Sequence, residues 1–119
     1  MTPTQVLRVA AAHLATPGAW TQGAFARDAE GRPTTANDHG AVCWCAVGAI
    51  IMACGPHAME WRGGWTPSHL LNDAHDAFGS VVPKRYATRP GKWADRPGRT
   101  VEEVCAKLLE AARKLEGRP

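Results

Sequence analysis

The chain has 119 residues, of which 45% are hydrophobic and 21% are charged, and its formal net charge is +3. This length allows one hydrophobic core and is too short for two, and the composition is that of a globular protein. The longest apolar run falls short of the roughly 20 residues that cross a bilayer, so we expect a single domain over residues 1–119 that does not span a membrane.

The N-terminus does not have the pattern of a secretory signal peptide. It lacks a basic region ahead of an apolar segment, and Arg8 and His13 interrupt the positions that such a segment would occupy. We therefore expect a cytoplasmic protein. In that reducing compartment, the four cysteines are expected to be free thiols.

The first elements in the chain are a predicted helix and a predicted hairpin. Thr2 and Gln5 have the spacing of a capping box, and apolar residues recur at helical spacing as far as Leu14. This pattern predicts a first helix of about twelve residues. Residues 19–35 alternate loosely between apolar and polar types around the turn-forming residues 28–31, which predicts a small β-hairpin.

The stretch at residues 41–54, AVCWCAVGAIIMAC, is apolar on every side and ends before a Gly-Pro pair. A helix without a polar face has to be surrounded by protein, so we predict a central buried helix here. A Thr-Pro pair at Thr66 predicts the next helix, which ends at Gly79. Thr100 and Glu103 form a second capping box and predict the last helix. The predicted fold is mainly α within an α+β class, with about four helices around the central one.

The segment at residues 84–99 supplies the positive character of the chain. It contains one acidic residue, Asp95, and six basic residues: Lys84, Arg85, Arg89, Lys92, Arg96 and Arg99. Its prolines and glycines exclude a long helix or a central strand. With Tyr86 and Trp93 interleaved, the composition is typical of a surface that binds an acidic partner, either protein or nucleic acid. The alternative is a solvated loop that Trp93 anchors to the core and in which Asp95 accepts N–H groups from the turn at residues 98–100.

Cys43 is the candidate for thiol catalysis. It lies near the start of the predicted helix at residues 41–54, where the helix dipole favours a thiolate. His57 or His39 could then act as the base, with Asp95 or Asp38 orienting it. No Gly-rich oxyanion loop is evident in the sequence, and free cysteines are mostly buried core residues. The core interpretation is therefore favoured over a thiol-dependent hydrolase or transferase.

Two further sets of polar residues have metal-ligand chemistry. The first comprises Cys43, Cys45, Cys54 and His57. On one helix, position 45 lies about 200° around the axis from position 43, so both thiols face one ion only if the helix starts after Cys45. The second set is His69, Asp73 and Asp76, for which a solvated helix face is a sufficient explanation. We expect no metal and no cofactor.

Three segments carry a resemblance to a known family: WTQGAFARD at residues 20–28, CWCAVGAI at residues 43–50 and WADRPGRTVEEV at residues 93–104. Together they resemble a family of small actinobacterial and phage-associated proteins of unknown function. The third family motif reads Trp-Asn-Asp, so Ala94 departs from it. The resemblance implies a phage or mobile-element source but no activity.

The leading hypothesis is a small intracellular interaction module that binds an acidic partner through the basic segment. The resemblance makes an inhibitor of a host or defence protein complex its specific form. One alternative is a thiol-dependent enzyme that uses Cys43 with His57. The other is nucleic-acid binding through residues 84–99.

Overall fold

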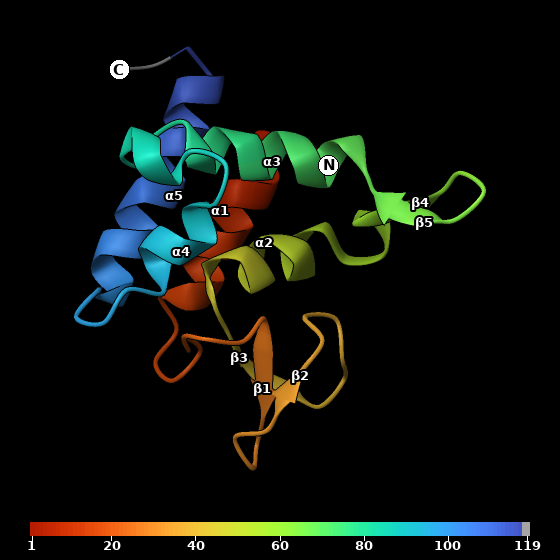
Figure 1. The fold of residues 1–119 in the computed structure, drawn as a ribbon, viewed down its shortest axis with the longest axis vertical. Coiled ribbons are helices and arrows are strands. Elements are labelled where there is room, and N and C mark those ends of the chain that lie inside the picture. Colours follow the sequence, from red (N-terminus) through yellow and green to blue (C-terminus); the bar gives the residue numbers. More distant parts are fainter. Residues whose placement is uncertain (118–119) are drawn as a thin grey trace.

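The computed structural model describes residues 1–117, which form an α+β fold with five α-helices and two small antiparallel sheets (Figure 1). The helices are α1 (Pro3–Leu14), α2 (Ala46–Cys54), α3 (His69–Gly79), α4 (Pro90–Ala94) and α5 (Val101–Leu115). The strands are β1 (Ala26–Asp28), β2 (Pro33–Thr34), β3 (Ala41–Trp44), β4 (Met59–Trp61) and β5 (Trp65–Pro67). Two single 3₁₀ turns complete the fold: η1 (Gly55–His57) and η2 (Lys84–Tyr86).

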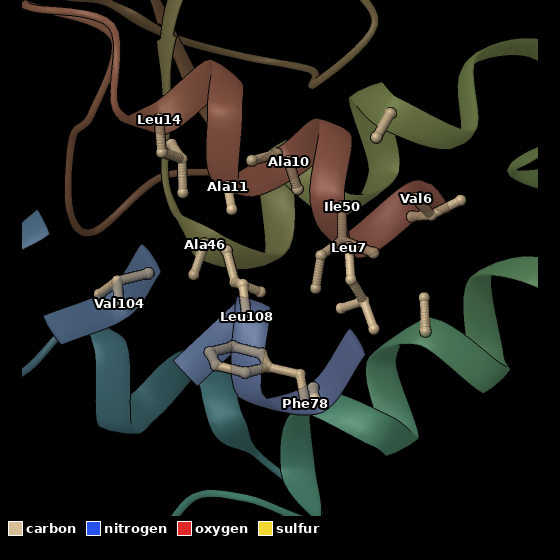
Figure 2. Close-up of a cluster of buried hydrophobic side chains, with 14 of the residues drawn as sticks. Val6, Leu7, Ala10, Ala11, Leu14, Ala46, Ile50, Phe78, Val104 and Leu108 are labelled. Atoms are coloured by element: carbon tan, nitrogen blue, oxygen red, sulfur yellow. The ribbon is translucent and has the colours of Figure 1, made fainter. Parts of the chain in front are cut away.

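The hydrophobic core lies between α1, α2, α3 and α5. Figure 2 shows their side chains converging on one cluster, to which α1 and α2 contribute five buried residues each. Its fully buried members include Leu7, Leu14, Ile50, Phe78 and Leu108. Many of the others are alanines, whose small side chains allow the helices to approach closely. None of the helices within residues 1–117 is long and apolar enough to cross a membrane.

The first and last helices are confirmed, together with their capping boxes. The Thr2 hydroxyl accepts the Gln5 N–H, and the Gln5 side chain accepts the Thr2 N–H. Thr100 and Glu103 form the same reciprocal pair at the start of α5. These local hydrogen bonds satisfy N–H groups that no helical carbonyl can reach, so the sequence alone locates them.

The predicted helix at residues 41–54 is wrong over its first five residues. Residues 41–44 form β3, which pairs antiparallel with β1, with Ala26 opposite Trp44 and Arg27 opposite Cys43. Cys45 is extended, and its thiol accepts the Gly48 N–H, so α2 begins only at Ala46. A run that is apolar at every position has no period that separates strand from helix.

The predicted hairpin at residues 19–35 is confirmed in its centre. β1 and β2 pair across the turn at residues 28–31, where the Gly31 N–H donates to the Asp28 carbonyl. β3 then adds on the other side of β1, so the hairpin is part of a three-stranded sheet in the order β2-β1-β3. This sheet lies below the helices in Figure 1.

The predicted start of the helix at Thr66 is also wrong. Thr66 belongs to β5, where it pairs with Glu60 of β4, and the Ser68 hydroxyl accepts the Leu71 N–H as the true cap of α3. The sequence did not reveal the β4–β5 hairpin, which projects from the helices in Figure 1. Its Trp61 and Trp65 side chains are 66% and 68% exposed and contact each other edge to face, with ring centroids 5.6 Å apart.

Because Ser68 is the cap of α3, removal of its hydroxyl should affect stability more than removal of the Thr66 hydroxyl. Ser68→Ala is expected to lower the free energy of unfolding by about 1 kcal/mol, because it removes the acceptor of the Leu71 N–H. Thr66→Ala, which removes an exposed strand hydroxyl, is expected to change it by less than about 0.5 kcal/mol. Urea denaturation followed by circular dichroism measures both. Equal losses would contradict the assignment of the cap.

Candidate functional site

The basic segment at residues 84–99 is folded tightly onto the helices rather than forming a plain loop. η2 and α4 lie within it, and the Gln22 amide donates to the carbonyls of Ala94 and Arg96, at 2.8 and 3.0 Å. The Gly79 Cα lies close enough to the Ala87 carbonyl that an added Cβ would be 2.0 Å from the oxygen. The cationic side chains are therefore displayed on an ordered backbone.

Trp93 is the anchor of this segment. Its side chain is only 6% exposed, and its ring meets the Phe78 ring edge to face, with centroids 6.3 Å apart. The Arg99 guanidinium lies 4.1 Å from the Trp93 ring centroid, and Arg99 also pairs with Glu103 at 3.0 Å. Trp93 thus anchors the segment to the core, and Arg99 is held beside it by the Trp93 ring and Glu103.

The other five cations of the segment form no salt bridge within residues 1–117: Lys84, Arg85, Arg89, Lys92 and Arg96. Two of them contact Tyr86. The Arg96 guanidinium donates to its hydroxyl at 2.6 Å, and Arg85 lies over its ring at 5.1 Å from the centroid. The hydrogen bond from Arg96 lowers the pKa of Tyr86.

An open groove of about 620 Å³ runs beside α4. Arg89, Lys92 and Arg96 line it on the α4 side, and His75 of α3 contributes to it as well. Its apolar lining includes Val47 of α2 and Phe25, which is 55% exposed for so large an apolar side chain. The groove therefore combines three cations with an exposed apolar wall.

A second pocket of about 430 Å³ adjoins the groove, and the two share Phe25, Val47, Gly91 and Asp95 among their linings. Its other walls come from residues 23–24, residues 33–34 and Cys45. Segments 20–28, 43–50 and 93–104, which are far apart in the sequence, therefore meet at one pocket. We call the groove and this pocket together the α4 site.

Asp95 is the carboxylate of the α4 site. Its Oδ1 is buried and has no hydrogen-bond partner among the residues that the structure describes. Burial raises the pKa of Asp95 above its ordinary value of 3.8, while the Gly23 N–H and Lys92 partly offset this effect. The expected donors in the turn at residues 98–100 are wrong in part, because the Thr100 N–H is used by Glu103.

The raised pKa predicts how Asp95 affects stability. Because folded Asp95 holds its proton more tightly than unfolded Asp95 does, the protein loses stability as pH rises from 3.8 through the raised pKa. Asp95→Asn has no carboxyl group to titrate. The free energy of unfolding of the variant minus that of wild type should therefore increase over this pH range and stay constant at higher pH. Denaturant titrations at several pH values measure the difference. An offset that does not vary with pH would contradict burial as the cause.

The comparisons with known proteins give a family but no activity. A family model covers residues 1–114. The chain belongs to this family of unknown function, DUF6197. No curated protein and no solved structure matches the chain. The function of this family member therefore has to be argued from the α4 site itself.

The structure does not bring Cys43 and His57, the candidate nucleophile and base, together. Cys43 lies half-buried on β3, and His57 is exposed in η1. The nine residues of α2 separate them, a rise of about 13 Å. His39 is exposed in the loop before β3, and Asp38 accepts the Gly40 N–H there. Cys45 is the thiol that lines the α4 site, but burial raises its pKa and so disfavours a thiolate.

The residues considered for metal binding are likewise dispersed. Cys43 and Cys45 precede α2, whereas Cys54 and His57 lie at its other end. In residues 1–117, no three His, Cys, Asp or Glu side chains are grouped to hold a metal ion. His69, Asp73 and Asp76 are exposed on α3, as the interpretation of a solvated face predicts.

Sequence reasoning missed three residues of the α4 site: Phe25, Val47 and His75. Phe25 lies in the segment before β1 and reaches the site only because its backbone crosses Gly48 of α2. His75 lies on α3 between acidic residues, and nothing in its sequence context distinguishes it from a solvated helix face. The one available signal was Phe25, a large apolar residue in a segment that is otherwise small and polar.

Proposed function

We propose that this protein is a small interaction module that binds an acidic protein segment through the α4 site. The observation that carries the proposal is the placement of Arg89, Lys92 and Arg96 along one groove, where none of them forms a salt bridge with a described residue. Cations that face solvent on an ordered backbone attract an acidic partner and fix its register. The adjacent apolar wall at Phe25 and Val47 adds area that becomes buried on binding.

A protein partner is favoured over nucleic acid because of the aromatic residues. Binding to single-stranded nucleic acid usually combines cations with exposed aromatic faces on which bases stack. Trp93, the candidate for that role, is buried against Phe78, and Arg85 lies over the Tyr86 ring, so neither aromatic residue of the basic segment presents a free face. Phe25 is the exposed aromatic side chain of the α4 site, and it lies across the groove from the cations. The specific form we propose is inhibition of a host or defence complex by a phage or mobile-element protein.

Capture from a lysate of the native host, with and without nuclease, tests this proposal. We expect a protein to bind the wild-type chain regardless of nuclease and to be lost with the triple variant Arg89→Glu, Lys92→Glu, Arg96→Glu. A control with the same change in net charge reverses Arg32, Arg62 and Arg113, which lie outside the α4 site. We expect the control variant to retain the partner. Loss of binding on nuclease treatment would instead support nucleic acid, and equal binding by both variants would exclude the groove.

A further inference from the structure

The pocket beside the groove is lined mainly by apolar residues, unlike the cationic side of the groove. At about 430 Å³ it lies near the lower end of the range of roughly 300–1,000 Å³ for small-ligand sites, which suits a single aromatic group. Ala24, Phe25, Pro33 and Val47 give it apolar walls. An aliphatic or aromatic group that entered here would lose its contact with water on the sides that face these walls.

Asp95 adds one hydrogen-bonding requirement to these apolar walls. It is the only carboxylate in the lining of the pocket and of the groove, and its Oδ1 lacks a partner among residues 1–117. An unsatisfied buried acceptor is unfavourable, and a donor that reaches this carboxyl group relieves the cost. An occupant of the pocket therefore gains from carrying an N–H or O–H at its polar end.

The neighbouring charges restrict which donor this can be. Lys92 is close enough to act electrostatically on Asp95, and Arg89 and Arg96 line the same groove. A lysine or arginine from a partner would meet these three cations, whereas a neutral donor would not. Tyrosine and tryptophan each combine a flat apolar body with one neutral donor, and both are frequent anchors in protein interfaces.

From these contacts we infer that the pocket binds a tyrosine or tryptophan side chain of the partner, with acidic residues on either side of it in the partner sequence. The aromatic body packs between Phe25 and Val47, its O–H or N–H donates to Asp95, and the flanking carboxylates pair with Arg89, Lys92 and Arg96. This inference rests on the proposed function and specifies the partner segment that the α4 site recognises.

Three capped pentapeptides test the inference by fluorescence anisotropy: Glu-Glu-Tyr-Glu-Glu, Glu-Glu-Phe-Glu-Glu and Glu-Glu-Ala-Glu-Glu, each with a dye on a common linker. We expect the tyrosine peptide to bind about tenfold more tightly than the phenylalanine peptide, as one hydrogen bond to a charged acceptor allows. The alanine peptide should bind most weakly. In Asp95→Ala, the preference for tyrosine over phenylalanine should disappear while the phenylalanine peptide still binds.

The outcomes separate this inference from the proposed function. Equal affinity of the wild-type protein for the tyrosine and phenylalanine peptides would overturn the inference, and this comparison needs no protein variant. If those peptides nevertheless lose affinity with Arg89→Glu, Lys92→Glu, Arg96→Glu, the acidic-partner proposal stands without the aromatic anchor. If none of the three peptides binds at low salt, both proposals fail.

Discussion

Gly48→Ala should lower the free energy of unfolding by about 3 kcal/mol, near the upper end of the cost of overpacking a core. A Cβ at this position would lie 1.8 Å from the Phe25 carbonyl oxygen and 2.7 Å from its carbonyl carbon. Both atoms belong to the backbone, so no side-chain rotation can relieve the clash. The segment before β1 would have to move away from α2.

Thermal and urea denaturation measure this loss, and Gly64→Ala is the matched control. Gly64 also has an ordinary φ, but a Cβ there would meet nothing within 4 Å. We expect the control to stay within about 0.5 kcal/mol of wild type. Gly48→Ala should also disturb the α4 site, since Phe25 lines both of its parts. A variant as stable as wild type would show that residue 25 does not approach α2 in this way.

Phe78→Ala should lower the free energy of unfolding by about 3–5 kcal/mol, which equals or exceeds the effect of Gly48→Ala. Phe78 is fully buried, lies on the α3 side of the cluster in Figure 2 and meets the Trp93 ring edge to face. Its removal leaves a cavity between α3, α5 and α4, and it deprives the basic segment of its anchor. The accompanying change should be a shift of Trp93 fluorescence toward that of an exposed indole.

Phe25→Ala is the control for this prediction, because it deletes the same atoms from a side chain that is 55% exposed. It should cost well under 1 kcal/mol of stability while weakening binding at the α4 site. A large loss with Phe25→Ala and a small one with Phe78→Ala would reverse the roles that the structure assigns to the two rings.

The parts of the fold that the sequence predicted are those with a local cause. Thr2 and Thr100 cap helices through partners three residues away, so their positions can be read without knowledge of tertiary structure. The strand at residues 41–44 could not be read in this way. Its apolar residues suit a helix equally well, and pairing with β1, more than a dozen residues earlier in the chain, decides between the two.

Only the part of the candidate site that depends on local composition could be predicted from the sequence. The cationic segment at residues 84–99 stands out by composition, but the sequence cannot show that Trp93 turns inward or that Arg99 is used beside it. Nor could it reveal that Phe25 and Val47 face the cations. That arrangement depends on a glycine, Gly48, at which two backbones meet.

The β4–β5 hairpin offers a contrasting surface to the α4 site. Its exposed Trp61 and Trp65 are apolar, and its charged residues Glu60 and Arg62 pair with each other at 2.9 Å. A surface of this kind has no unpaired charge to select an acidic segment. In Figure 1, α4 lies at the left of the molecule and the β4–β5 hairpin projects at the right, so an experiment that locates binding distinguishes them.

The most direct test of binding at the α4 site is a titration of ¹⁵N-labelled protein with the capped peptide Glu-Glu-Tyr-Glu-Glu, followed through the backbone amide chemical shifts. Saturable shifts are expected in residues 23–25, at Val47 and within residues 88–97, where the α4 site lies. These shifts should be lost with Arg89→Glu, Lys92→Glu, Arg96→Glu. Shifts centred on the β4–β5 hairpin, or no saturable shifts at low salt, would show that the α4 site does not bind such a segment.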